Sequence, residues 1–359
     1  MQRIGLKQVL VLAVTAALCV PTSAAAMETD FYGQIDQLVM YASDGNESSV
    51  MIGDNDNSSS RVGVKIKEKL DSITIGGVME IEGQLNASNK MTIPQNDDGD
   101  FEWNVRKMEG YFQGGYGKVS LGQGDGAANG TAEVDLSGTK LITYSQINAT
   151  AGSMSWVDSA GNPIAEVNET RDVYDGLSRN ERVRYDTPSW AGFSFAASMT
   201  NGAAYELAAR YSGNLYGKLE AAIGYVDTND REKNGTKLDF TQWDTSASWL
   251  LKNGLNFTAT VSQRNNGDNG KPPESLNYYG KIGYKWGIQA LSVEYGATLD
   301  KDQEGDTSSN FGIGYVIKPW KKVELYAAVR QYSLDREGIN SLSKKDRLFL
   351  DNMTLPRLG

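Results

Sequence analysis

The side chains best suited to chemistry in this sequence are basic residues at alternate positions of strand-like stretches. Arg61, Lys65 and Lys67 alternate with apolar or small residues in one stretch, and Arg182 and Arg184 are two positions apart in another. Successive side chains of a β-strand point to opposite faces, so the basic groups of each stretch share one face. Placing one of these basic side chains on the lipid-facing side would destabilise the protein by about 2–4 kcal/mol at the bilayer midplane. We therefore expect them to face a water-filled interior.

Carboxylates that could oppose these basic groups lie in a long connecting segment and on a neighbouring strand. Residues 126–179 form an unusually long connection, and such connections are commonly functional. We expect this segment to fold into the interior, where Glu133 and Asp135 face Arg61 and Arg184 across water. A solvated surface loop remains the alternative for these two carboxylates. Glu80 and Glu82, which alternate on the strand that follows the first basic stretch, are predicted to line the wall with Lys65 and Lys67.

Catalysis is poorly supported by the composition. The chain has no histidine and one cysteine, which excludes Ser-His and Cys-His arrangements and histidine-ligated metals. The glycine-rich stretch 122–130 lacks the spacing of a phosphate-binding loop. The stretch 53–60 alternates carboxylates and amides as calcium loops do, but no glutamate closes it, so a solvated loop and a weak divalent-cation site both remain open. We predict no enzyme activity and no cofactor, and we assign no metal ligands.

The first 26 residues have the features of a secretory signal peptide. Arg3 and Lys7 form a basic region, residues 9–20 form an apolar core too short to span a bilayer, and Ala24 to Ala26 fit the cleavage pattern. We expect one mature domain over residues 27–359, without disulfides because the only cysteine lies in the signal peptide. A formal net charge of −10 argues against nucleic acid as a partner.

Two-residue periodicity and the spacing of turn residues predict an all-β chain. The sixteen predicted strands cover residues 28–42, 60–69, 72–87, 102–115, 118–125, 180–187, 191–200, 203–212, 215–227, 239–251, 255–265, 276–286, 289–299, 308–317, 322–334 and 346–358. Short and long connections alternate between them, with the turn at 201–202 as the exception. An even number of strands with short turns at one end and long loops at the other predicts a transmembrane antiparallel β-barrel.

Three tryptophans lie beside short turns at predicted strand ends. Amphipathic aromatic rings favour the interface between lipid and water, so we expect Trp190, Trp286 and Trp320 to form an aromatic girdle at the periplasmic boundary. The alternative is that they cap the ends of a water-soluble β-sandwich.

Four stretches, taken in order, resemble the general porins of Gram-negative bacteria. They are FYGQIDQLVMY (31–41), SSRVGVKIKEKL (59–70), YGKVSLGQGDG (116–126) and LSRNERVRYDTPSWAGFSFAASM (177–199). Together with the signal peptide and the strand count, the resemblance covers nearly the whole chain. It implies a sixteen-stranded barrel that is usually a homotrimer. It also implies that the third loop folds inward and narrows the pore, with loop carboxylates facing a basic cluster on the wall.

The same resemblance assigns residues to the pore constriction. They are Arg61, Arg106, Glu133, Asp135, Arg179, Arg182 and Arg184. Arg61 matches the wall arginine of the family's second strand and Arg106 that of its fourth strand, whereas the two acidic residues are assigned by position only. Alternation is ambiguous at Arg106, because Lys107 and Glu109 would then face outward.

The end of the sequence departs from the family pattern. Family members end on an aromatic residue, whereas this sequence ends DNMTLPRLG. Pro356 falls in the last predicted strand, where proline removes a donor from the hydrogen-bond ladder. Either the natural chain extends beyond Gly359, which is our prediction, or the last strand is irregular.

Together these features predict a passive outer-membrane channel of a Gram-negative bacterium for small hydrophilic solutes and ions. Its other partners would be membrane lipid and lipopolysaccharide. A non-conducting barrel that serves adhesion or envelope anchoring is the alternative. The sequence leaves the solutes and the preference for cations or anions open, because Glu80 and Glu82 oppose Arg61 and Lys65 in the interior.

Overall fold

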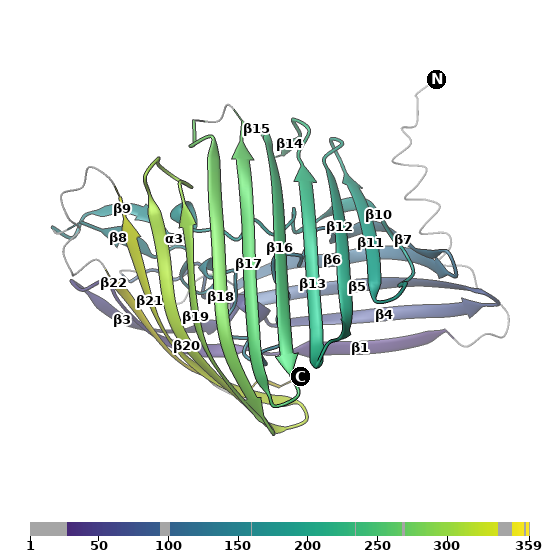
Figure 1. Ribbon diagram of the computed structural model, residues 1–359, viewed down its shortest axis with the longest axis horizontal. Helices are drawn as coiled ribbons and strands as arrows, with labels where there is room; N and C mark the ends of the chain where they lie inside the picture. Colours follow the sequence, from purple (N-terminus) through teal and green to yellow (C-terminus); the bar gives the residue numbers. More distant parts are fainter. Residues whose placement is uncertain are drawn as a thin grey trace.

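The computed structural model describes residues 27–93, 101–158, 160–233, 235–267, 270–336, 347–354 and 357–358. The predicted signal peptide and Pro356 lie outside these residues. Figure 1 shows long strands from the middle of the chain, β12 to β18, running side by side as one curved wall.

Most of the chain forms one antiparallel sheet of 19 strands. The N-terminal strands are β1 (Glu28–Gln34), β2 (Gln37–Ser43), β3 (Ser48–Asp54), β4 (Arg61–Leu70), β5 (Ile73–Leu85), β6 (Phe101–Gly114) and β7 (Gly117–Asp125). The central strands are β10 (Arg179–Asp186), β11 (Phe193–Thr200), β12 (Tyr205–Asn214), β13 (Gly217–Asp227), β16 (Phe240–Leu251) and β17 (Leu255–Asn266). The C-terminal strands are β18 (Glu274–Trp286), β19 (Gln289–Leu299), β20 (Thr307–Trp320), β21 (Val323–Asp335), β22 (Arg347–Thr354) and β23 (Arg357–Leu358).

The remaining elements are short and lie in connections. Two sheets of two strands each pair β8 (Ser155–Val157) with β9 (Pro163–Glu166) and β14 (Glu232–Lys233) with β15 (Thr236–Lys237). The helices are the 3-10 turn η1 (Asp56–Ser58), α2 (Asn148–Ala151) and α3 (Val167–Thr170). None of the helices in the described ranges is long and apolar enough to cross a membrane.

The predicted all-β class is confirmed, and the N-terminal region differs most from the predicted strands. The strand predicted at 28–42 is interrupted after Gln34, where Asp36 is fully buried. The backbone N–H of Asp36 donates to the hydroxyl of Ser60 at 2.9 Å. The sequence predicts a polar connection between residues 43 and 59, yet β3 lies there. This prediction was wrong because only the short apolar centre of β3, around Met51, separates two runs of Asp, Asn and Ser.

Neighbours in the sheet follow the order of the chain. β1 pairs with β4, and each strand then pairs with the next from β4 through β7, β10 and the central strands to β21. β22 pairs with β21 on one side and with β2 on the other, so the C-terminal part of the sheet lies beside its N-terminal part. β2 also pairs with β3.

The two faces of the sheet have the reverse polarity of a water-soluble protein. On β18, Tyr278 and Ile282 are 37% and 57% exposed, whereas Asn277 and Lys281, each the residue before one of them, are 0% and 3% exposed. This alternation confirms the two-residue periodicity from which the strand at 276–286 is predicted. Exposed apolar residues opposite buried polar ones are typical of barrel strands that face lipid, and they argue against the water-soluble sandwich. We refer to the buried side as the polar face.

Short connections join β4 to β5, β6 to β7, β12 to β13, β16 to β17, β18 to β19 and β20 to β21. The antiparallel order of the strands puts the connection between β10 and β11, residues 187–192, at the same end of the sheet. The predicted tryptophans lie at this kind of connection. Trp286 and Trp320 are the last residues of β18 and β20, and Trp190 lies in the connection between β10 and β11. Their side chains are 37%, 68% and 79% exposed, respectively.

The connection between β7 and β10, residues 126–178, lies against the polar face, and we refer to it as the long segment. Its backbone N–H groups at Val134 and Leu136 donate to Ser246 and Ser248 of β16 at 3.0 and 2.9 Å. Further along, the hydroxyl of Tyr332 on β21 donates to the backbone carbonyl of Ile147 at 3.3 Å. Serine, threonine and tyrosine hydroxyls of the wall thus satisfy the backbone of a segment that has little secondary structure of its own.

An apolar core fills the space between the long segment and the wall at β2 and β3. Its buried members are Leu38, Met40, Ala42, Met51, Met91, Ile93, Ile147, Ala151, Met154, Trp156, Ala165, Val167, Tyr279, Tyr332 and Leu334. The core packs the middle of the segment against β2, β3 and β21.

Candidate functional site

A network of ion pairs lies on the polar face of β4, β5 and β6. Arg106 Nε lies 2.7 Å from Glu80 Oε1, and Arg106 also contacts Glu82. Arg61 Nε lies 3.8 Å from Glu80 Oε2, which accepts a hydrogen bond from the hydroxyl of Tyr32 at 2.8 Å. The side chains of Arg61 and Arg106 are 21% and 16% exposed, so neither is fully buried by its ion pairs.

A β-bulge explains how consecutive charged residues share this face. In the pairing of β5 with β6, Glu80 opposes Lys107, and the register then shifts so that Arg106 has no opposite residue. An extra residue in one strand re-aims side chains and is common at barrel rims and functional sites. Arg106 therefore reaches Glu80, while Lys107 Nζ lies 2.5 Å from Asp125 Oδ2. The bulge resolves the ambiguity in the predicted alternation, which assumed a regular strand.

The three arginines of β10 hold the beginning of the long segment. Arg182 Nε donates to the backbone carbonyl of Asp125 at 2.9 Å, and Arg184 Nη1 donates to that of Gly126 at 2.7 Å. Arg179 Nε lies 3.0 Å from Asp125 Oδ1. The side chain of Arg182 is only 3% exposed, because it also contacts Glu109, whereas those of Arg184 and Arg179 are 17% and 28% exposed. Arg182 is thus an anchor that has little contact with solvent.

The two predicted carboxylates of the long segment have different surroundings. Asp135 contacts the amine of Lys281 on β18, and the two side chains are 4% and 0% exposed. Alternation places Lys281 on the inner face, but nothing in the sequence indicates that it binds this carboxylate. Glu133 is partly exposed, and its backbone carbonyl accepts a hydrogen bond from Lys140 Nζ at 2.9 Å. The ion-pair partner of Asp135 is therefore Lys281, on the strand against which the long segment packs.

Asp175 of the long segment lies in a buried acidic environment. Its carboxylate oxygens accept hydrogen bonds from the backbone N–H groups of Gly130 at 2.7 Å and Ala132 at 2.9 Å. Burial, and then the charges of Glu133 and Asp244, raise the pKa of Asp175 well above its ordinary value. The folded structure therefore favours the protonated form of the Asp175 carboxyl group.

Two buried arginines that sequence reasoning missed fasten the long segment to β19, β20 and β21. Arg330 Nε lies 2.6 Å from Glu294 Oε1, with both side chains at 1% exposure or less, and Arg330 Nη1 donates to Thr150 Oγ1 at 2.9 Å. Arg171 Nη1 donates to the backbone carbonyl of Ser308 at 2.7 Å. Burial lowers the pKa of Arg171 to about 10. Alternation could have placed Arg330 on the polar face, but its partners are distant in sequence.

The predicted wall lysines of β4 are exposed. Lys65 Nζ lies 4.7 Å from the ring centroid of Tyr32, and Lys67 Nζ lies 2.8 Å from Glu28 Oε2 with both side chains more than half exposed. Such exposed pairs contribute little to stability.

The stretch 53–60, where a weak divalent site was an open alternative, uses its carboxylates for internal contacts. Asp54 accepts hydrogen bonds from Gln37 Nε2 at 2.9 Å and from the backbone N–H of Ser60 at 3.0 Å. Over the ranges that the structure describes, no three His, Cys, Asp or Glu side chains are grouped to hold a metal ion. Asn55 instead donates to the backbone carbonyl of Leu141 at 3.2 Å and so touches the long segment.

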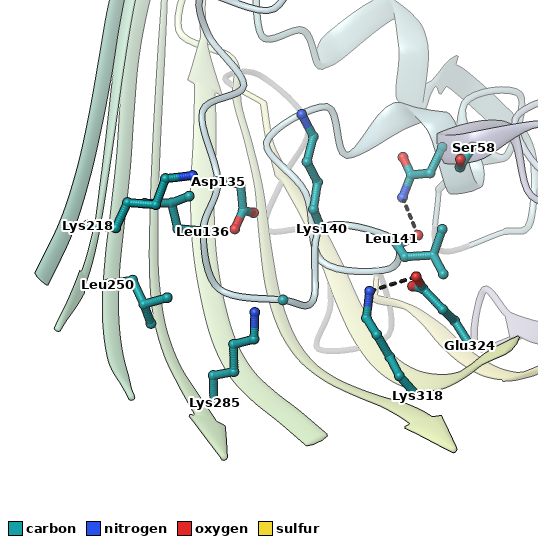
Figure 2. Close-up of a pocket in the computed structure, with 12 residues that line it drawn as sticks. Ser58, Asp135, Leu136, Lys140, Leu141, Lys218, Leu250, Lys285, Lys318 and Glu324 are labelled. Carbon is teal, nitrogen blue, oxygen red and sulfur yellow. Dashed lines mark hydrogen bonds and ion pairs between the residues drawn. The ribbon is translucent and has the colours of Figure 1, made fainter. Parts of the chain in front are cut away.

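A pocket of about 450 Å³ lies beside the bend of the long segment at residues 135–141. Figure 2 shows the lining side chains, with Lys285 directed at the bend and Lys318 paired with Glu324. The charged lining residues are Asp135, Lys140, Lys218, Lys285, Lys318 and Glu324. The three wall lysines come from different strands, β13, β18 and β20, and each lies close to a short connection.

An all-β sheet with an apolar exposed face, a polar face covered in part by a long segment, and clustered charges beside it defines a membrane channel built from strands. The family model for Gram-negative porins matches residues 12–337 of the sequence. The chain therefore belongs to the Gram-negative porin family, whose members are channels of the outer membrane.

Solved porin structures share this fold at low sequence identity. The anion-selective porin from Comamonas acidovorans is 14% identical, with 93% of this chain and 99% of that chain covered and a TM-score of 0.66. The trimer form of OmpT from Vibrio cholerae is 15% identical, with 93% and 99% covered and a TM-score of 0.59. The outer-membrane channel DcaP of Acinetobacter baumannii is 12% identical, with 94% and 99% covered and a TM-score of 0.56. No curated protein sequence matches this chain.

Proposed function

We propose that this protein is a passive channel through which small hydrophilic solutes and ions diffuse across the outer membrane. The observation that carries the proposal is the arrangement of the long segment. It lies on the polar face, held to β16, β18, β19, β20 and β21, while the partly exposed Arg61 and Arg106 lie on β4 and β6. A water-filled passage between a packed loop and a charged wall selects solutes by width and by charge.

The proposed barrel is closed and consists of sixteen barrel strands. In this count β1 and β2 form one interrupted barrel strand, β3 and β4 form another, and β22 and β23 form the last. Each of the other thirteen strands of the large sheet counts as one barrel strand. The pairing of β22 with β2 supports closure. Closure suits a membrane because lipid cannot hydrogen-bond a free strand edge, and a barrel of this size encloses an aqueous lumen.

The constriction is proposed to lie between the long segment and the network of Arg61, Arg106, Glu80 and Glu82. The partial exposure of both arginines supports this position. Glu133 supplies negative charge from the opposite side, whereas Asp135 and Arg182 act mainly through their buried contacts. Arg179 and Arg184 shape the constriction by fixing where the long segment begins.

The outer surface is proposed to contact lipid and lipopolysaccharide, with Trp190, Trp286 and Trp320 at the periplasmic interface. Their exposure beside short connections supports this orientation. We further propose a single mature domain over residues 27–359, exported through a cleaved signal peptide and assembled as a homotrimer. Trimers among related porin structures support the assembly.

Conductance in planar bilayers tests the function. The purified full chain is expected to insert and give stepwise increases in current in potassium chloride. Insertion without any current would contradict the proposal and favour the alternative, a non-conducting barrel for adhesion or envelope anchoring. Insertion itself is checked independently by resistance to protease after reconstitution into vesicles. This measurement distinguishes a folded barrel that does not conduct from a protein that failed to insert.

A further inference from the structure

We propose that the pocket beside the bend of the long segment binds small anions that carry more than one negative charge, of the dicarboxylate or phosphate type. The inference rests on the proposed function, since it places a solute site within the channel. The pocket has a volume of about 450 Å³, which falls in the usual range for small-molecule sites. Its charged lining has four lysines and two carboxylates.

The two carboxylates do not cancel the basic charge of the pocket. Asp135 contacts Lys281, which lies outside the lining, and this pair is almost completely buried. Glu324 Oε1 lies 2.6 Å from Lys318 Nζ. The amines of Lys140 and Lys285 therefore remain without a carboxylate partner within the described ranges, which leaves the lining with excess positive charge.

Lys285 is the central residue of the proposed site. Its side chain projects at the bend of the long segment, as Figure 2 shows. A Cβ atom on Gly138 would lie 3.5 Å from Lys285 Cδ and 3.7 Å from its Cε, so the aliphatic stem rests against the bend. Gly138 has a φ of +84°, a conformation that glycine adopts without strain. The bend thus supports the stem of a lysine whose amine stays exposed to solvent.

Lys218 and Lys318 can exchange their present partners for an anion. Lys218 Nζ lies 2.7 Å from Glu220 Oε1, with the side chains 52% and 30% exposed. The pair of Lys318 with Glu324 is similarly exposed, at 48% and 25%. Exposed ion pairs of this kind contribute little, so a solute carboxylate or phosphate competes readily. A solute with two anionic groups can contact amines from more than one strand, which favours it over a solute with a single charge.

The position of the pocket is consistent with a low-affinity binding site at one mouth of the channel. Lys218 is the second residue of β13, Lys285 the next to last of β18, and Lys318 lies two residues before the end of β20. All three are near short connections, the end that we assign to the periplasm. Binding there raises the local concentration of anionic solutes, and hydrated lysine amines release them easily.

The test measures chloride current through reconstituted channels at low salt and neutral pH, with succinate, inorganic phosphate or acetate added. Succinate or phosphate is expected to reduce the current saturably, and acetate to have much less effect. The half-blocking concentration is expected to rise about fivefold in Lys285→Gln, the effect of one lost charge at a hydrated site. High salt is expected to weaken the block by screening. Block of the current by only one of these two anions would identify whether the site prefers a dicarboxylate or a phosphate group.

The matched control is Lys252→Gln, which removes the same charge from an exposed lysine in the connection between β16 and β17, outside the pocket. Equal half-blocking concentrations in the two variants, or an open channel with no saturable block, would overturn the site and leave the channel intact. If the protein inserts but carries no current, the proposed function fails. The site is then judged by calorimetric titration of the detergent-solubilised chain with succinate, where heat lost in Lys285→Gln alone supports it and no heat in any variant rejects it.

Discussion

The amine of Lys281 on β18 contacts the carboxylate of Asp135 in the long segment, and neither side chain is more than 4% exposed. The same amine donates to the backbone carbonyl of Thr143 at 2.9 Å. One buried lysine of the sheet thus contacts the long segment on both sides of its bend, at Asp135 and at Thr143. Buried pairs of this kind are costly to break, because the remaining partner keeps its charge without compensation.

The first prediction concerns this pair. Lys281→Met leaves Asp135 buried and uncompensated, so we expect a loss of about 3–5 kcal/mol in the free energy of unfolding. The double variant Lys281→Met with Asp135→Leu should recover most of the loss. Urea unfolding of the folded protein in detergent micelles, followed by tryptophan fluorescence, measures both values. Lys252→Met serves as the control at an exposed position, and a Lys281→Met variant as stable as this control would show that the pair does not hold the segment.

The second prediction is a dependence of stability on pH that comes from Asp175. An acid with a raised pKa in the folded state binds its proton more tightly there, so its contribution is fully present below the ordinary aspartate value of about 3.9. The contribution is lost as the pH rises through the folded-state pKa. We therefore expect Asp175→Asn to destabilise the protein less, or to stabilise it more, as the pH increases.

Unfolding measured at several pH values for the parent and for Asp175→Asn tests this sign. Asp158→Asn provides a control of opposite sign, because hydrogen bonds from Asn162 lower the pKa of Asp158 and its contribution is lost as the pH falls. A constant difference in stability between the parent and Asp175→Asn across the pH range would mean that Asp175 does not titrate with folding.

The sequence predicts strands well where alternation is regular, and fails where local geometry breaks it. The faces of β18 follow directly from the spacing of Tyr278, Ile282 and Lys281. The bulge at Arg106 leaves no mark in the sequence, because it depends on the register of β5 against β6. β3 is hidden because its apolar centre is too short to stand out among polar neighbours.

The candidate site could be predicted in its residue types and only partly in its contacts. Arg61, Glu80 and Glu82 come together because they lie on adjacent strands in register, which alternation and strand order imply. The contacts of Asp135 and Arg330 join residues more than 140 positions apart, through a segment with little regular structure. Their geometry depends on how the segment packs, for which periodicity carries no information.

The third prediction concerns orientation in the membrane. Cysteine substitutions at Trp190, Trp286 and Trp320 are expected to react with a membrane-impermeant maleimide from the periplasmic side only, because each lies exposed beside a short connection. The one natural cysteine is at position 19, within the predicted signal peptide. A cysteine at Gly270, in the long connection between β17 and β18, is the control that should react in whole cells. Reaction of the tryptophan positions in whole cells would reverse the orientation.

The last prediction concerns the charged wall. Arg61 is 21% exposed, and its Nε lies 3.8 Å from Glu80 Oε2, so its substitution changes the charge beside the proposed passage. Arg61→Gln should shift the permeability ratio towards cations by about twofold to fivefold at low salt, the effect of one hydrated charge a few ångströms from the ion path. The reversal potential under a salt gradient measures the shift, which should fade at high salt because screening shortens to about 3 Å at 1 M. Lys237→Gln removes the same charge from the exposed β14–β15 hairpin and should leave the ratio almost unchanged. Equal reversal potentials for these two variants at low salt would place Arg61 away from the ion path and leave its ion pairs as its only role.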